Sequence, residues 1–207
     1  MSDLPGVVRL RDRREALTLR TILTTARRLF AEHGYARTPI RSIAKEAGVA
    51  PQTIYAHFGS KAGVLNGLVD LMDEEAGLPE LLAEAGEMTD PDALLGLLAR
   101  ACRQVRERCG DIVTMLNTGA AVSPDIATTQ AEGARRNRLG VETVIERVRA
   151  TGRDVHPKAV DIAVALMSAG VHDSLVLDAG WAPEDYEAWL KDTLVTAVLL
   201  DRGTEPR

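Results

Sequence analysis

Residues 48–61 read GVAPQTIYAHFGSK, and this stretch decides the fold. Gly48 suits a tight turn because glycine readily takes a left-handed conformation. Pro51 suits the first position of a new helix, where the backbone N–H that proline lacks has no helical partner to lose. Ile54 and Phe58 are four residues apart and therefore share one face of that helix. The stretch predicts a turn followed by a short helix that buries this face.

With that face buried, the opposite side of the short helix carries small and polar side chains. Gln52 and Ala56 turn outward and Thr53 and Tyr55 lie on the flanks, at roughly 100° of rotation per residue. Such a surface fits a DNA major groove about 12 Å wide, in which a glutamine can pair with adenine through two hydrogen bonds. The alternative, in which Tyr55 and His57 only fill gaps in a three-helix core, stays open from the sequence.

The residues before this stretch predict two further helices. Apolar residues recur with the spacing of one helix face at Ile22, Ala26, Leu29 and Phe30. This first helix ends at Gly34, which suits the left-handed residue after a helix. Thr38 is placed to cap a second helix that has Pro39 at its first position and runs to Ala47. The order helix, helix, glycine turn and helix is that of a helix-turn-helix.

Charge divides the chain into two unequal parts. Residues 1–61 hold 11 Lys and Arg against 5 Asp and Glu, whereas residues 62–207 hold 14 against 25. This asymmetry predicts a basic domain that meets a polyanion and an acidic domain that does not. Ser60 is placed to cap the next helix, and Lys61 adds positive charge to N–H groups that already favour a phosphate. We therefore expect two domains, residues 1–61 and residues 62–207.

The second part shows only helical periodicity, so we expect an all-α fold with a three-helix N-terminal domain and a larger helical domain. Helices are predicted near residues 92–109, 111–120, 125–151, 157–179 and 183–201. Thirteen of the twenty residues in 160–179 are apolar and surround the helix, so one buried stripe does not account for them. A second copy would cover the other side, which predicts a homodimer through residues 157–201.

Several classes of protein are disfavoured by the sequence. The four histidines lack metal-ligand spacing, and neither a glycine-rich phosphate loop nor a nucleophile elbow occurs, so we expect no enzyme, no cofactor and no metal. No signal-peptide run and no apolar stretch of about 18 residues occurs, which predicts a cytoplasmic protein without membrane contact. Cys102 and Cys109 on one helix would lie about 10 Å apart, too far for a disulfide, so free thiols are expected.

The segment ILTTARRLFAEHGYARTPIRSIAKEAGVAPQTIYAHFGSKAGVL, residues 22–65, resembles the DNA-binding domain of the TetR family of bacterial transcriptional regulators. The positions that match the family pattern are Ile22, Ala26, Phe30, Gly34, Tyr35, Thr38, Ile43, Ala44, Gly48, Val49, Tyr55, Phe58 and Lys61. The tail DAGWAPEDYEAWL is similar to the link between the two dimerising helices in many members. The resemblance implies an all-α homodimer, a palindromic operator, and repression relieved by a small ligand.

The resemblance also implies particular DNA contacts. Those to phosphates fall on Thr38, Thr53, Tyr55, His57 and Lys61, and those to bases fall on Arg41, Pro51, Gln52 and Tyr55. Ala50 departs from the family, which often has a serine cap there, and losing such a cap costs on the order of 1 kcal/mol. The arm from Arg9 to Arg14 either reaches DNA or is a solvated terminus, and the sequence leaves both open.

The ligand is less well defined. Family analogy places a pocket among the fourth to eighth helices, where the candidate lining residues are Met72, Cys102, Met115 and His172. Each of them can equally be a core residue, and His172 with Asp173 can serve hydrogen bonding in the core or at a dimer interface. Residues 62–180 contain no aromatic side chain, so an aliphatic or acyl-like hydrophobic ligand fits better than a flat cation. A DNA-binding dimer without an inducer is the alternative.

Overall fold

The structure is a computed structural model that describes residues 5–200, with side chains described from residue 12 onward. Within this part every regular element is helical, and the one pairing of extended backbone is an isolated antiparallel bridge between Val155 and Leu199. The predicted all-α fold class is confirmed.

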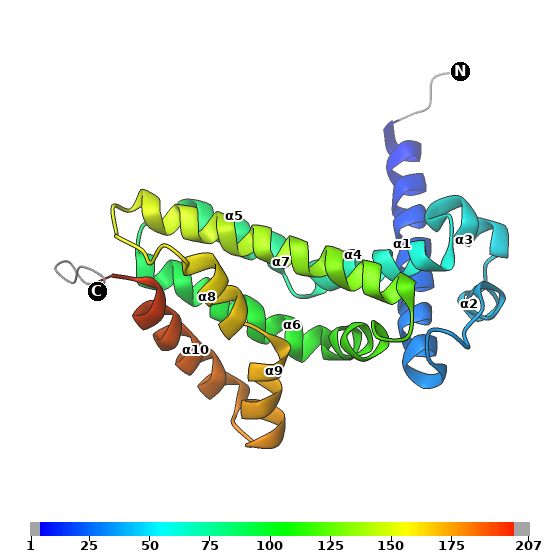
Figure 1. The fold of residues 1–207 in the computed structure, drawn as a ribbon. Helices are drawn as coiled ribbons and strands as arrows, with labels where there is room; N and C mark the ends of the chain where they lie inside the picture. Colours follow the sequence, from blue (N-terminus) through cyan, green and yellow to red (C-terminus); the bar gives the residue numbers. More distant parts are fainter. Residues whose placement is uncertain (1–4, 201–207) are drawn as a thin grey trace. The chain divides into compact units, whose positions relative to one another are not determined.

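The helices follow one another along the whole described chain (Figure 1). They are α1 (Pro5–His33), α2 (Ile40–Ala47), α3 (Pro51–Phe58), α4 (Lys61–Glu75), α5 (Leu78–Glu87), α6 (Pro91–Gly119), α7 (Pro124–Ala150), α8 (Ala159–Leu166), α9 (Ala169–His172), the π-helical segment η1 (Asp173–Asp178) and α10 (Pro183–Val198).

These helices form two compact units. The first unit holds the described residues up to Leu71 together with Thr114–Gln130, and the second holds Met72–Val113 together with the described residues from Ala131 onward. The helices α4, α6 and α7 each continue from one unit into the other. The net charge of the chain changes from basic to acidic after Lys61, and this position lies inside the first unit. The boundary between basic and acidic sequence therefore differs from the boundaries between the compact units.

The core of the first unit is built from the apolar faces that the sequence pattern predicts. Its largest fully buried side chains are Phe30, Ile22, Leu29, Ile43, Ile54, Leu65 and Leu68. Gly34 and Gly48 have φ of 81° and 69°, as the predicted turns require. The N–H of Gly63 donates to Ser60 Oγ at 3.0 Å, which confirms Ser60 as the cap of α4.

Two glycines at the start of α4 allow α3 to pack closely. A Cβ on Gly63 would lie 1.7 Å from the carbonyl oxygen of Phe58. A Cβ on Gly67 would lie 2.9 Å from side-chain atoms of both Leu23 and Phe58. No side chain fits at Gly63, because the atom it would meet belongs to the backbone, whereas at Gly67 the Leu23 and Phe58 side chains would have to shift.

The prediction for Thr38 as a helix cap is wrong. Pro39 is the residue that precedes α2, and no side chain caps that helix. The Thr38 hydroxyl is buried and lies 2.9 Å from the carbonyl oxygen of Gly34 and 3.2 Å from that of Leu29. Its single hydrogen therefore serves a backbone carbonyl in the last turns of α1 or directly after that helix.

The core of the second unit gathers side chains from α5, α6, α7, α8 and α10, and α8 and α10 lie side by side (Figure 1). Its fully buried members include Leu94, Leu95, Ile145, Tyr186, Leu190 and Leu194. Apolar residues of α8, α9 and η1 are only partly buried against this core, among them Ile162, Val164, Met167, Val171 and Leu175. The unit thus leaves part of the apolar surface of residues 157–201 exposed.

The prediction of one helix over 157–179 is wrong. Residues 157 and 158 form a turn, in which the N–H of Lys158 donates to Nδ1 of His156 at 3.0 Å, and α8 begins only at Ala159. Ser168 is extended, with φ −64° and ψ 149°, so α8 stops before it and α9 starts after it. The axes of the two parts meet at 44°. Apolar composition alone does not reveal such a break.

Two further boundaries differ from the sequence prediction, and one agrees with it. The helix α6 spans both helices expected at 92–109 and 111–120, and its backbone leaves the helical conformation at Cys109, where φ is −136°, next to the break expected at residue 110. The helix α5 is missing from the predicted helices, and it holds Pro79 in its first turn, where proline is tolerated. The last helix ends at Val198, since Leu199 is extended and pairs with Val155.

None of the individual helices in the described residues is long and apolar enough to cross a membrane. One bent pair, Ala159–Leu166 with Ala169–Asp178, meets the criteria of length and composition only.

Candidate nucleic-acid interface

The second helix of the helix-turn-helix, α3, is held in place by its buried face. Ile54 is completely buried, and Ile43 and Ala44 of α2 are buried in the same core. Gly48 is left-handed, and its N–H and that of Val49 bond to carbonyl groups at the end of α2. These contacts hold α3 at a fixed angle to α2 and leave its other side to solvent.

The exposed side of α3 carries the side chains that the sequence predicted for reading DNA. Gln52 is exposed, Tyr55 is 52% exposed, and Ala56 between them adds no bulk. Pro51 and Thr53 are half-buried at the edges of this surface. The predicted orientation of α3 is therefore confirmed, whereas its contacts with DNA stay a prediction.

The start of α3 is as weakly capped as the sequence suggested. Ala50 precedes the helix in extended conformation, and no side chain bonds to the free N–H groups of the first turn. Those groups are available to a phosphate oxygen, because a helix N-terminus attracts anions.

Lys61 is placed at the start of α4 but is engaged within the protein. Its ammonium donates to the carbonyl oxygen of Tyr35 at 2.8 Å and lies 4.2 Å from the centre of the Tyr35 ring. Burial lowers the pKa of Lys61, and the nearby carboxylate of Asp125 opposes that effect. Because an ammonium has three hydrogens, this geometry still leaves Lys61 able to donate to a phosphate.

The Tyr35 contact also involves a residue that sequence reasoning missed. The buried Tyr35 hydroxyl donates to Oδ2 of Asp125 at 2.7 Å, and burial together with this bond raises the pKa of Tyr35. Asp125 lies 90 residues further along, in the first turn of α7, which packs in the first unit. No local pattern connects the two positions, so only the folded chain identifies Asp125 as a support of Lys61 and Tyr35.

The remaining predicted contacts are spread around α3. Arg41 on α2 is exposed. Nδ1 of His57 lies 3.6 Å from a carboxylate oxygen of Glu15 on α1. Thr38 is buried with its hydroxyl donated inside the protein, so its side chain has no donor to offer a phosphate. Of the predicted DNA contacts, Thr38 alone is buried with its hydroxyl engaged inside the protein, and the others stay a prediction.

The N-terminal arm is described only in part. Arg13 and Arg14 are exposed on α1, whereas the side chains of Arg9 and Arg11 lie outside the described residues. The question of whether the arm reaches DNA stays open.

Comparison with known proteins matches the same region. Residues 22–68 fit the model of the bacterial regulatory proteins of the tetR family. The chain is 37% identical over 84 residues to the HTH-type transcriptional regulator TtgR of Pseudomonas putida, a match that covers 41% of this chain and 39% of TtgR.

Two solved structures share the fold over most of their length. The SmeT–triclosan complex has a TM-score of 0.67 at 21% identity, with 92% of this chain and 98% of that chain covered. A transcriptional regulator of the TerR/AcrR family from Aquifex aeolicus VF5 has a TM-score of 0.62 at 20% identity, covering 86% and 98%. Residues 22–68 therefore carry a DNA-binding domain of the TetR type. Since the sequence match spans about two fifths of TtgR, the activity and partners of the whole chain are matters for proposal.

The four predicted ligand-lining residues belong to both compact units. Met115 lies in the first unit and Met72, Cys102 and His172 lie in the second. Cys102 and His172 do come together, because Cys102 Sγ lies 3.3 Å from the hydroxyl of Tyr186 and the His172 ring packs edge-on against that tyrosine at 5.0 Å. Burial raises the pKa of the Cys102 thiol, as expected for an unreactive core cysteine.

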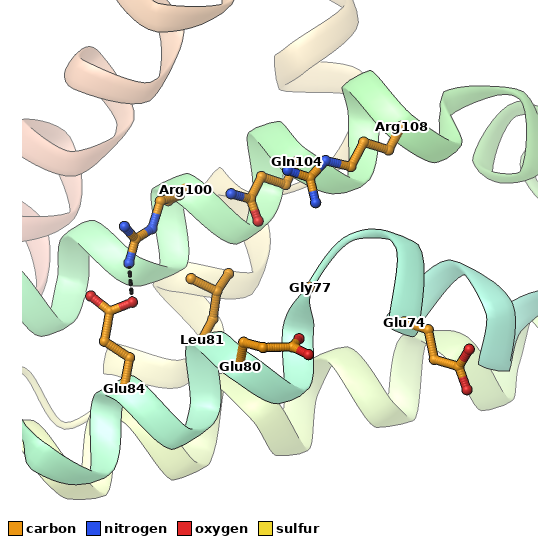
Figure 2. A pocket seen from close by; sticks show the side chains of 8 residues that line it. All are labelled: Glu74, Gly77, Glu80, Leu81, Glu84, Arg100, Gln104 and Arg108. Carbon is orange, nitrogen blue, oxygen red and sulfur yellow. Dashed lines mark hydrogen bonds and ion pairs between the residues drawn. The ribbon is translucent and has the colours of Figure 1, made fainter.

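A polar hollow lies elsewhere in the second unit, between α5 and α6 (Figure 2). Its volume is roughly 400 Å³, and the residues that line it are Glu74, Gly77, Glu80, Leu81, Glu84, Arg100, Gln104 and Arg108. Glu84 pairs with Arg100 at 2.5 Å across it. None of the predicted ligand residues lines this hollow, and its charged walls do not suit a hydrophobic ligand.

Proposed function

We propose that this protein is a transcriptional repressor of the TetR family that binds a palindromic operator as a homodimer and is released by a small hydrophobic ligand. Its base contacts are assigned to Arg41, Pro51, Gln52 and Tyr55. Its phosphate contacts are assigned to Thr53, Tyr55, His57 and Lys61.

The observation that carries this proposal is the geometry of α3. A short helix anchored by the fully buried Ile54 presents the exposed Gln52 and Tyr55 on a surface small enough for the major groove. The surrounding sequence up to residue 61 has an excess of six positive charges, which supplies the attraction to phosphates that any duplex offers.

The proposed dimer follows from the apolar surface of the second unit. One helix-turn-helix reads about half a turn of DNA, and two related by twofold symmetry read half-sites about 34 to 36 Å apart. The partly buried apolar residues of α8, α9, η1 and α10 supply a self-complementary face for such a dimer.

The proposed ligand response rests on the second unit and on helix continuity. This unit has a large aliphatic core, and SmeT, which shares its fold, is a protein whose structure contains triclosan. Because α4, α6 and α7 each continue into the first unit, a ligand that shifts them would alter the spacing of the two α3 helices. We assign no catalytic step to the protein, and we place its action on chromosomal DNA in the cytoplasm.

The proposal is tested by selecting duplexes from a random library with the immobilised protein. The expected result is an enriched palindrome with half-site centres one helical turn apart, or a multiple of it. A variant with Ile54→Asp, which puts a charge under α3, is the control for α3-dependent binding and should enrich nothing. Enrichment of no sequence by the wild-type protein, or of a site without twofold symmetry, would contradict the proposal.

A further inference from the structure

A buried polar cluster joins α6 to the segment that follows α9. We call it the Arg106 cluster, and its members are Cys102, Arg106, His172, Asp173 and Tyr186. All five lie in the second unit. Cys102 and Arg106 are four residues apart on α6 and share a face, and Tyr186 of α10 contacts both Cys102 and His172.

Arg106 is the unusual member, because its guanidinium is buried without being fully satisfied. Only 7% of its side chain is exposed. Its Nε donates to Nδ1 of His172 at 3.3 Å, and its Nη2 pairs with Oδ1 of Asp173. Its Nη1 is buried and has no hydrogen-bond partner among the described residues. A buried donor on a charged group that lacks a partner is destabilising, so its presence calls for a function.

Asp173 satisfies Arg106 poorly. It offers one oxygen to one nitrogen, whereas a guanidinium is best paired by a carboxylate that engages two nitrogens at once. The same oxygen lies 3.1 Å from Nδ1 of His172, the atom that also accepts from Arg106. One ring nitrogen cannot accept from Arg106 and donate to Asp173 together, so one of these contacts is always unfavourable.

The carboxylate of Asp173 can also separate from Arg106. Its side chain is 40% exposed, so its carboxylate can be rehydrated when it separates from Arg106. It is the first residue of η1, a π-helical segment, and such segments often occur at functional sites. The extended Ser168 interrupts the helix five residues earlier, so the backbone that carries Asp173 is not held by one continuous helix.

We propose that Arg106 is the anchor of a binding site for an aliphatic carboxylate, whose two oxygens replace Asp173 and pair with Nη1 and Nη2. The proposal rests on the proposed function, since it names the chemical class of the ligand to which the repressor responds. The carboxylate satisfies the nitrogen that the protein leaves unpaired and releases Asp173 to solvent.

The aliphatic part of the ligand follows from the surroundings of the cluster. Met167, Val171 and Leu175 are partly buried aliphatic residues on the segment that carries His172 and Asp173. The carbonyl of Met167 contacts Cys102 Sγ at 3.5 Å, which places this segment against α6. An unbranched hydrocarbon chain can pack against these aliphatic side chains, of which Met167 adapts most readily to an irregular ligand.

The test uses sodium octanoate as the probe, octanamide as its uncharged counterpart, and isothermal titration calorimetry on the full-length protein. Octanoate should bind at least about tenfold more tightly than octanamide, because only the carboxylate forms charge-assisted bonds with Arg106. Equal binding of the two compounds, or no binding of octanoate, would overturn the proposal.

Two variants and a control locate the site. Arg106→Lys keeps the charge but removes the planar pair of donors, so octanoate should bind about tenfold more weakly. Asp173→Asn removes the competing carboxylate and should strengthen octanoate binding several-fold, a result that remains informative if Arg106→Lys fails to fold. Arg103→Lys, which alters a partly exposed arginine of α6 paired with Glu107 and Glu187, should change nothing. Octanoate binding that Asp173→Asn leaves unchanged or weakens would refute displacement of Asp173.

A parallel titration with the selected operator separates this inference from the proposed function. If the protein binds operator but does not prefer octanoate over octanamide, the carboxylate site is wrong and the repressor proposal stands. If octanoate binds through Arg106 but the protein enriches no operator, the site stands and the repressor proposal fails. If both bind and octanoate weakens operator binding, operator must weaken octanoate binding by the same factor, because linkage is reciprocal.

Discussion

At the scale of single residues, the interface depends on glycines as much as on the side chains that meet DNA. Gly63 lies in the first turn of α4, next to Lys61, and the end of α3 passes directly over it. The sequence signalled the left-handed Gly48 but gave no sign that Gly63 is needed, because that need comes from the nearness of the Phe58 carbonyl. Close approach between two elements cannot be found in the pattern of either one.

This contact leads to a prediction for Gly63→Ala. The added Cβ would lie 1.7 Å from a backbone oxygen, so α3 and α4 must separate, and we expect unfolding to become easier by about 2 to 4 kcal/mol. Urea unfolding followed by circular dichroism measures this change. Gly140→Ala in α7, where nothing lies within 4 Å of the new Cβ, is the matched control and should stabilise by about 0.5 to 1 kcal/mol. Similar effects of the two substitutions would show that Gly63 is not constrained.

At the scale of elements, the sequence predicted α2 and α3 well and the segment 157–179 poorly. The helix-turn-helix is marked by local signals, which are Gly48, Pro51 and the spacing of Ile54 and Phe58. The segment 157–179 is apolar on all sides, so its pattern could not locate the break at Ser168 or the π-helical turn after it. The Arg106 cluster was likewise beyond prediction, because it joins positions 66 and 67 residues apart. Sequence reasoning singled out His172 and Asp173 but not Arg106.

The proposed dimer is formed by the last helices, and the exposure of each residue in them determines whether its substitution tests association or folding. Val198 is fully buried in its own unit, so a charge there would test folding and not association. Leu177 in η1 is 66% exposed, so Leu177→Asp leaves the single chain intact while placing a carboxylate on the proposed interface. We expect sedimentation equilibrium to show a dimer weakened at least about tenfold, equivalent to about 1.4 kcal/mol.

Leu139→Asp supplies the control for that experiment. Leu139 is 47% exposed on α7, outside residues 157–201, so the same change should leave the dimer unaffected. A dimer that survives Leu177→Asp but dissociates with Leu139→Asp would move the interface to α7.

At the scale of the whole molecule, the chain combines a basic helix-turn-helix with an acidic helical body. The acidic balance of residues 62–207 disfavours contact with a polyanion, so residues 1–61 are expected to approach the duplex. The fold comparisons cover nearly the full length of the SmeT and Aquifex aeolicus structures, whereas the family model matches residues 22–68 and the sequence match to TtgR covers 41% of this chain. Sequence, structure and comparison therefore agree best on the surface that is proposed to read the operator.

The central claim is that Gln52 on α3 of each copy reads a base in each half-site of a palindrome. The most direct test measures base preferences at every position of the selected operator for the wild-type protein and for Gln52→Ala. Gln104→Ala, the same truncation in the second unit, is the control. We expect Gln52→Ala to cost about 1 to 3 kcal/mol and to relax preference at one symmetry-related pair of positions, while Gln104→Ala changes none. Unchanged preferences in Gln52→Ala would contradict the claim.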